Sequence, residues 1–314
     1  MTSMVSIDNR YSEDQPRDPD GKFGSGGGGG SSKDDDKGAG DTGADTPPVS
    51  SSPRLGYGDT PVSNETATKM STGSAAKHLV KNSDGTTSFT PERQALHDEI
   101  VTNAVQNIPS SENPTLYMMG GGPAAGKSSM LESGAINVPD KNSAVQINAD
   151  DVRTKFPEYD QMVNAGDKNA GAFTHEEASH VSKRITNAAI ERNQNMVLDG
   201  TGDSSEANLN AKIDNARANG YRVEGNYASV PVQMAVDRAN SRGDRTGRYV
   251  PETFIRETYK AISNVFPKVA GNFDKVNLFD TSGKTPRLLA TGGAGKLSIV
   301  DQAGYDRFLS ESGD

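Results

Sequence analysis

The sequence contains no cysteine, which excludes a disulfide framework, a thiolate metal site and a cysteine nucleophile. Its four histidines are scattered and do not have the spacing of a zinc site. No apolar run approaches the roughly 20 residues that a membrane-spanning helix needs. The N-terminus lacks the apolar core of a secretory signal, so we expect a soluble, cytoplasmic protein without a membrane partner.

Apolar residues are also scarce, at 32% of the 314 residues, whereas glycine occurs 34 times. This composition is too lean for the whole chain to bury a normal core, so part of the chain is expected to be disordered. The formal net charge is -9, which disfavours non-specific binding to nucleic acid. We therefore expect a folded domain beside a disordered segment, and no nucleic-acid partner.

Residues 1–87 have the composition of the disordered segment, since they are rich in Gly, Ser and Asp. Five consecutive glycines follow Ser25, and residues 33–37 are all charged. Glycine-rich chain loses much conformational entropy on folding and has no side chains to bury. A flexible tail or linker is the simplest interpretation. The alternatives are a tether to a larger assembly, a segment that folds on a partner, and a cloning remnant at residues 33–37.

Apolar runs and helical patterns alternate from residue 88 onward. Thr90 and Pro91 are typical of a helix N-cap and first position, and the capping box from Thr174 to Glu177 predicts another helix start. Strands are expected at residues 115–119, 144–147, 196–198, 221–229 and 276–279. Strands separated by helices predict an α/β fold with a mostly parallel sheet flanked by helices, which we assign to residues 88–285. Residues 286–314 are expected to form a C-terminal hairpin and a short helix.

A glycine-rich motif directly follows the first of these strands. Residues 121–128 fit the pattern G-x-x-x-x-G-K-[ST] of phosphate-binding loops. The glycines let backbone N–H groups surround a phosphate, Lys127 can reach the β- and γ-phosphates, and the Ser128 hydroxyl can bind Mg²⁺. A strand before the motif and a helical segment after it disfavour a chance match. The residues expected to cradle ATP are Gly121, Gly122, Pro123, Ala124, Ala125, Gly126, Lys127, Ser128 and Ser129.

Four segments together resemble the zeta toxin family in order and approximate spacing. They are residues 120–129, 147–150, 197–201 and 238–248, the last followed by Val250 and Pro251. The resemblance spans about residues 88–285 and implies a P-loop kinase fold. It further implies an enzyme that uses ATP and Mg²⁺ to phosphorylate a hydroxyl of UDP-N-acetylglucosamine, and a small antitoxin protein that restrains it.

Asp150 lies just past the second expected strand, at the sheet edge where ligands bind in open α/β folds. A carboxylate there can accept the proton of an attacking hydroxyl. The family has Asp-x-Asp at this place, and the resemblance implies that Asp150 takes the position of the second Asp, the general base. The first Asp of the pattern is Asn148 here, which is a departure from the family. The alternative is that Asp150 or Asp151 simply caps the next helix, and of the two we expect Asp151 to have this role.

The resemblance implies that three further residues contact the substrate. Asp199 and Thr201 follow the third strand where the family has an acidic residue and Gly-Thr, while Asp203 stands where some members have Arg. A solvated loop with capping residues is the alternative for this segment. The family also places a glutamate of the next helix against the substrate, which suggests Glu177. The alternative is that Glu177 has a structural role, as the residue at the third helical position of the capping box.

Arginines gather at residues 238–248 of this acidic chain. Arginine side chains neutralise the charge that develops during phosphoryl transfer. The resemblance implies that Arg242 and Arg248 contact the ATP phosphates, and we expect Arg238 to pair locally. The alternative for Arg242 and Arg248 is that they form surface ion pairs with Asp237 and Asp244.

Two other functions are compatible with these patterns. Asn148 and Asp203 depart from the family, which keeps open another small-molecule P-loop kinase that acts on an antibiotic, a nucleoside or a polynucleotide end. The glycine-rich segment keeps open an inactive nucleotide-binding module that is tethered to a larger assembly.

Overall fold

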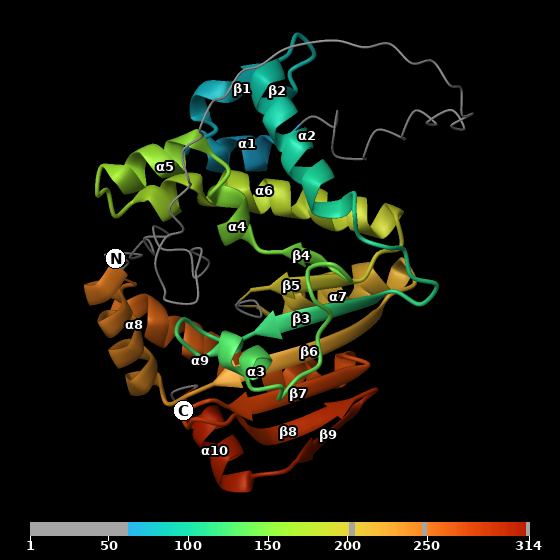
Figure 1. The fold of residues 1–314 in the computed structure, drawn as a ribbon, viewed down its shortest axis with the longest axis vertical. Coiled ribbons are helices and arrows are strands. Elements are labelled where there is room, and N and C mark those ends of the chain that lie inside the picture. Colours follow the sequence, from blue (N-terminus) through green and yellow to red (C-terminus); the bar gives the residue numbers. More distant parts are fainter. Residues whose placement is uncertain (1–61, 201–204, 247–249, 312–314) are drawn as a thin grey trace, which may run out of the picture.

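The computed structural model describes residues 62–200, 205–246 and 250–311, and Figure 1 shows their arrangement. The expected disorder of residues 1–61 lies outside the described residues. So do three residues that the sequence analysis singled out, namely Thr201, Asp203 and Arg248.

A seven-stranded sheet forms the centre of the protein, with the strand order β4-β5-β3-β6-β7-β8-β9. The first five strands are parallel, and β8 and β9 extend the sheet as an antiparallel hairpin. Each strand expected for the parallel sheet is present, and the α/β fold class is confirmed. The strand bounds are β3 Thr115–Gly120, β4 Val145–Ile147, β5 Met196–Asp199, β6 Arg222–Ser229, β7 Lys275–Asp280, β8 Arg287–Gly293 and β9 Lys296–Ile299.

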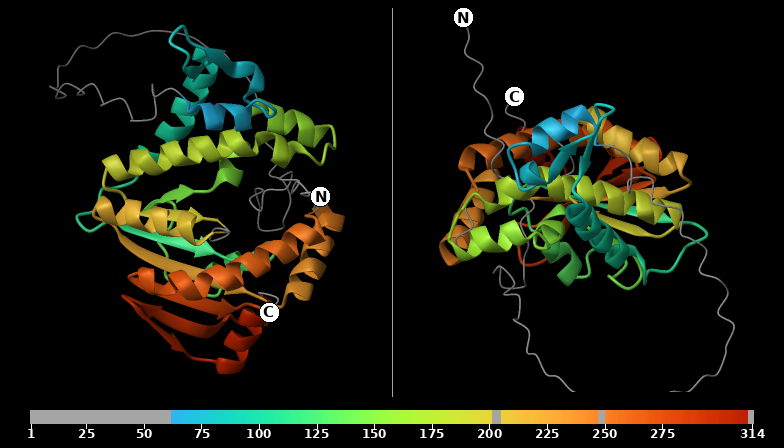
Figure 2. Two further views of the ribbon diagram at one scale, coloured as in Figure 1. Left: turned by 180° about the vertical axis from the view of Figure 1, so that it is seen from behind. Right: turned by 90° about the horizontal axis from the view of Figure 1, so that it is seen from above.

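Helices surround this sheet on several sides (Figures 1 and 2). The view from behind in Figure 2 shows α7 (Glu206–Ala218) and α9 (Glu252–Val269) in front of the sheet. On the opposite side, α3 (Lys127–Glu132) lies in front of the strands in Figure 1. Beyond β4, α2 (Pro91–Val105), α4 (Ala149–Arg153), α5 (Pro157–Asn164) and α6 (Ala170–Glu191) pack together. Helices α8 (Val232–Thr246) and α10 (Gln302–Ser310) belong to the C-terminal part of the chain.

Two helix starts test the capping predictions. Thr90 is the N-cap of α2, and its side chain accepts a hydrogen bond from the Arg93 N–H, which confirms that prediction. The capping box at Thr174 is wrong, because α6 already begins at Ala170. Thr174 is buried inside the helix, and its hydroxyl donates to the Ala170 carbonyl over 2.8 Å. A local motif cannot report this, since the extra turn forms where the chain packs against neighbouring elements.

Residues 62–89 are structured, so residues 62–87 differ from the expected disordered segment. They form α1 (Asn64–Met70), a 3₁₀ turn (Ala76–His78) and the hairpin strands β1 (Leu79–Lys81) and β2 (Thr87–Phe89). A small apolar cluster of Val62, Met70, Ala75 and Phe89 supports them. The Ser74 N–H also donates to the Phe173 carbonyl of α6 over 2.8 Å. Composition averaged over the whole segment hides these few apolar residues.

No helix among the described residues is long and apolar enough to cross a membrane.

Candidate functional site

The glycine-rich motif forms the loop between β3 and α3, at the carboxyl end of the central parallel strand. Gly121 and Gly126 have φ angles of 136° and 83°, which glycine adopts without the steric cost of a Cβ. A Cβ on Gly121 would lie 2.6 Å from the Ala228 carbonyl oxygen, and one on Gly126 would lie 2.9 Å from Ser129 Oγ. The loop conformation therefore requires glycine at these two positions.

Lys127 points its ammonium group back into this loop. The side chain is buried, and Nζ donates to the carbonyl oxygens of Gly121, at 3.3 Å, and Gly200, at 2.9 Å. Nζ also lies 3.5 Å from Asp199 Oδ1, whose side chain is 43% exposed. The positive charge of Lys127 is thus held within the loop by two carbonyl groups and one solvent-accessible carboxylate.

The parallel register explains how Asp199 reaches the loop. Met119, at the end of β3, pairs with Asp199, at the end of β5, and the Gly200 N–H donates to the Met119 carbonyl over 3.1 Å. The next strand, β4, pairs with β5 in parallel, with Ile147 opposite Leu198. Because parallel strands end at one edge of the sheet, the residues that follow β3, β4 and β5 lie along the same edge.

Asp150 lies in the first turn of α4, three residues beyond β4. Its side chain is buried, and Oδ1 lies 3.1 Å from Nη2 of the fully buried Arg153. The N-cap of α4 is Asn148, whose side-chain oxygen accepts the Asp150 N–H over 2.9 Å, so the expected capping role of Asp151 is wrong. Asn148 therefore orients the turn that carries Asp150.

Asp151 differs from Asp150 in having an exposed side chain. Even so, desolvation by the surrounding protein raises the pKa of Asp151, and the negative charge of Asp199 raises it further. The carboxylates of Asp151 and Asp199 therefore interact electrostatically, and Asp199 is the one that lies beside the lysine of the loop.

The donors at this edge can be compared with what Mg²⁺ requires. Among the described residues, no three His, Cys, Asp or Glu side chains gather as a metal site. Mg²⁺ bound with a nucleotide usually keeps several waters and uses one or two protein oxygens besides the phosphates. The exposed hydroxyl of Ser128 and the accessible carboxylate of Asp199 are donors of this kind. The residues present fit a nucleotide-bound Mg²⁺ better than a cage made only of protein groups.

The arginines of α8 lie in different environments. Arg242 is buried, whereas Arg245 is exposed. Arg238 donates from Nη2 to the carbonyl oxygens of Thr281, at 3.0 Å, and Ser282, at 3.4 Å, so its partners lie far along the chain and not in the local sequence. Thr281 is a residue that sequence reasoning missed: its hydroxyl donates to the Ala125 carbonyl inside the loop. No local pattern signals this contact, because the two residues are 156 positions apart.

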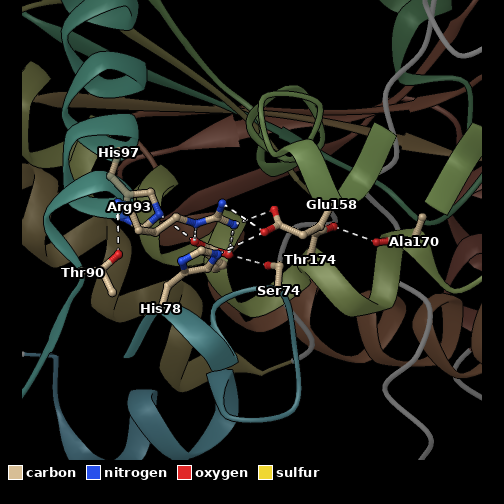
Figure 3. Close-up of polar contacts among 9 residues, drawn as sticks. Ser74, His78, Thr90, Arg93, His97, Glu158, Ala170 and Thr174 are labelled. Atoms are coloured by element: carbon tan, nitrogen blue, oxygen red, sulfur yellow. Dashed lines mark hydrogen bonds and ion pairs between the residues drawn. The ribbon is translucent and has the colours of Figure 1, made fainter. Parts of the chain in front are cut away.

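Glu177 lies in a different place from the loop residues, within α6. Its carboxylate accepts hydrogen bonds from Nε of Arg93 at 2.5 Å, from Nη2 of Arg93 at 2.8 Å, from Nε2 of His97 at 2.8 Å and from the Ser74 hydroxyl. Arg93 also pairs with Glu158 of α5 at 3.0 Å. Both carboxylate oxygens of Glu177 are therefore bound to protein groups. Figure 3 shows the side chains of Ser74, Arg93 and His97 converging in this cluster.

Comparisons with known proteins agree on one family. The model of the zeta toxin family matches residues 98–290, more than half of the chain. The chain is 24% identical to Toxin zeta of Enterococcus hirae over 127 residues, which are 40% of this chain and 43% of that protein. It is 24% identical to Toxin zeta of Streptococcus agalactiae over 106 residues, which are 34% and 36% of the two chains. The chain thus spans less than half the length of these curated relatives.

Solved structures share the fold. The crystal structure of AvrRxo1-ORF1:-ORF2 with ATP matches with a TM-score of 0.55 at 17% identity, and the match covers 71% of this chain and 74% of that one. A chain of the PezAT toxin-antitoxin system of Streptococcus pneumoniae matches with a TM-score of 0.51 at 14% identity, over 63% and 80% of the two chains. At these identities, the similarity concerns the fold alone.

Proposed function

The chain belongs to the zeta toxin family, and from this premise we propose that it is an ATP-dependent phosphotransferase that acts on a hydroxyl group. The observation that carries the proposal is the arrangement at one edge of the parallel sheet. Three neighbouring strands end there. Strand β3 leads into the loop with the buried Lys127, β5 ends at the accessible carboxylate of Asp199, and β4 leads into the turn with Asp150. Phosphate binding and proton acceptance are the two tasks that phosphoryl transfer to a hydroxyl requires.

ATP is the proposed phosphate donor. The backbone N–H groups of residues 121–129 would surround its phosphates, and Lys127 would exchange its carbonyl and carboxylate partners for phosphate oxygens. Mg²⁺, held with the phosphates by Ser128, would neutralise charge on the transferring group. The AvrRxo1-ORF1:-ORF2 complex, which shares the fold, was solved with ATP and supports this donor.

Asp150 is the proposed general base. It would accept the proton of the acceptor hydroxyl while that oxygen forms its bond to the γ-phosphorus and the bond to the β-phosphate oxygen breaks. Asn148 positions the turn, and Arg153 offsets the cost of burying the carboxylate. Arg242, together with Arg248 outside the described residues, would stabilise the charge on the transferred group.

The finer proposal is that the acceptor is UDP-N-acetylglucosamine and that Asp199 and Thr201 contact it, as family membership suggests. Glu177 is not part of this proposed site, because Arg93, His97 and Ser74 already occupy its carboxylate. A small antitoxin protein is the proposed partner. The PezAT toxin-antitoxin system, which shares the fold, supports it.

The test measures ADP formation by the full chain with Mg²⁺ and ATP, with and without UDP-N-acetylglucosamine. Asp150→Asn should bind ATP normally but transfer phosphate about 10²–10⁴-fold more slowly, because the base is lost while the loop stays intact. The matched control is Asp151→Asn, which removes the adjacent carboxylate and should keep most of the activity. Circular dichroism would check that both variants are folded.

Three outcomes separate the levels of the proposal. Stimulation by the sugar nucleotide would support it in full. ATP binding with turnover on other hydroxyl compounds only would overturn the acceptor and leave the kinase. Equal activity of Asp150→Asn and the unaltered chain would overturn the assignment of the base.

A further inference from the structure

A hydroxyl group behind the phosphate-binding loop connects that loop to the neighbouring strand. Thr281 directly follows β7, and its side chain is 2% exposed. Its N–H donates to the Ser229 carbonyl over 2.9 Å, which continues the pairing between β6 and β7 by one residue. The backbone of Thr281 is therefore held by the sheet, and its side chain starts from a fixed position.

The Thr281 hydroxyl lies close to two carbonyl groups. Oγ1 contacts the Ala125 oxygen inside the loop, and it lies 3.2 Å from the Ser229 oxygen. A hydroxyl has one proton to donate, and the Ala125 oxygen is the nearer acceptor. A Cβ on Gly126 would lie 3.0 Å from this same Oγ1, so Thr281 also packs against the turn of the loop. The hydroxyl thus fixes the carbonyl side of the loop from strand β7.

Arg238 extends this connection to helix α8. Its Nη2 donates to the carbonyl oxygens of Thr281 and Ser282. Asp280 stabilises the same segment, since its Oδ1 accepts the Ser282 N–H over 2.8 Å. Arg238 is one helical turn before Arg242, on the same helix face. One short segment after β7 therefore contacts both the phosphate-binding loop and the helix that carries Arg242.

We infer that Thr281 is a positioning residue that holds the loop in its phosphate-binding conformation, and that Arg238 couples this residue to helix α8. The inference rests on the proposed binding of ATP in the loop. Ala125 lies between the two glycines with positive φ, so a carbonyl that rotates there would turn the adjoining N–H groups away from a phosphate. The hydroxyl prevents this rotation before the nucleotide arrives, which lowers the ordering cost of binding.

The experiment compares Thr281→Val, Thr281→Ser and Thr174→Val in the full chain. Valine keeps the shape of threonine and removes the hydroxyl, whereas serine keeps the hydroxyl. Thr174→Val is the matched control, because it removes another buried hydroxyl that donates to a backbone carbonyl, in α6. The measurements are the Kd for Mg²⁺-ATP by calorimetry, KM and kcat for transfer, and hydrogen exchange of residues 120–130.

Thr281→Val should weaken ATP binding about 3- to 10-fold, as the loss of one net hydrogen bond predicts. The loss should appear in KM more than in kcat, and exchange at residues 120–130 should be faster without nucleotide. Thr281→Ser should restore both, and Thr174→Val should change neither. Arg238→Met should weaken ATP binding too, and its effect should be less than additive with Thr281→Val because both act on one segment.

Failure of this inference differs from failure of the proposed function. If the unaltered chain binds ATP and Thr281→Val binds it equally well with unchanged exchange, Thr281 does not position the loop. If the unaltered chain does not bind ATP, the proposed function fails, and the exchange comparison alone then decides whether Thr281 holds the loop. Equal effects of Thr281→Val and Thr174→Val would assign both hydroxyls to general stability and overturn the inference.

Discussion

The surroundings of Lys127 and Glu177 show two ways of burying a charge. Arg93, His97 and Ser74 bind both oxygens of the Glu177 carboxylate, in a buried cluster formed by α2, α5, α6 and the turn that follows α1. Lys127 has two backbone carbonyls and one accessible carboxylate. A buried charge with strong, permanent partners stabilises one structure. A charge with weaker partners at the sheet edge can exchange them for a ligand.

Acid–base behaviour shows the same contrast. Burial opposes the ionisation of Glu177, but hydrogen bonds from Arg93, His97 and Ser74 outweigh burial and lower its pKa to about 2. Burial lowers the pKa of His97, although the hydrogen bond to Glu177 opposes this. The arrangement therefore pairs an ionised Glu177 with a neutral His97 that donates from Nε2. At the loop, by contrast, desolvation and the charge of Asp199 raise the pKa of Asp151.

The largest expected effect is on stability. Glu177→Gln should lower the free energy of unfolding by about 3–5 kcal/mol, because it leaves the buried Arg93 without a full counter-charge. Urea denaturation would measure the change, with Glu176→Gln as the matched control on the same helix. ATP affinity below the melting temperature should be unchanged. A loss of stability no larger than that of the control would show that the cluster is not a structural element.

The next effect concerns the loop. Lys127→Met should reduce phosphate transfer about 10²–10³-fold, as removal of one group that stabilises transition-state charge does. The free energy of unfolding should change far less than in Glu177→Gln, because methionine keeps much of the apolar stem in place. Steady-state kinetics and denaturation of both variants would make the comparison. If each variant lost activity and stability in equal measure, the two regions would not differ in role.

Acid should separate the two regions further. The pKa of Glu177 is about 2 in the folded chain against 4.5 ordinarily, so its contribution is present above pH 4.5 and is lost as the pH falls toward 2. The difference corresponds to about 3 kcal/mol. Burial, together with the charge of Arg184, lowers the pKa of His180 to about 4, so stability should also decrease from pH 6.5 to 4. Unfolding curves should show a shallower loss below pH 4.5 in Glu177→Gln. An identical slope would contradict the low pKa.

The smallest expected effect compares two glycines with positive φ. Gly126→Ala would place a Cβ 2.9 Å from Ser129 Oγ, whereas Gly134→Ala would meet open space. The left-handed backbone should cost each substitution about 1 kcal/mol of stability, and the close contact should add to this cost only in Gly126→Ala. Only Gly126→Ala should weaken ATP binding, as measured by calorimetry. Weaker binding in both variants would locate the effect in helix α3 rather than in the loop.

Local patterns predicted the sheet and the loop well. The strands at residues 115–119, 196–198 and 276–279 were confirmed within a residue or two, because apolar runs bounded by turns are a local property. The same approach failed at Thr174, where tertiary packing extends α6 beyond the apparent capping box. Local patterns also failed to predict that residues 62–87 are structured, because the few apolar side chains there form a small cluster of their own.

The sequence by itself determined where the strands lie along the chain, where the glycine-rich loop lies, and which residue types are available for phosphate chemistry. Only the tertiary structure decided which buried charges have permanent partners. Arg93 reaches Glu177 across 84 residues, and Thr281 reaches Ala125 across 156. Such contacts depend on the spatial packing of distant elements, and no local periodicity or spacing records them. This is why Asp150 and Lys127 could be singled out from motifs, while the partners of Glu177 and Thr281 became visible only in the folded chain.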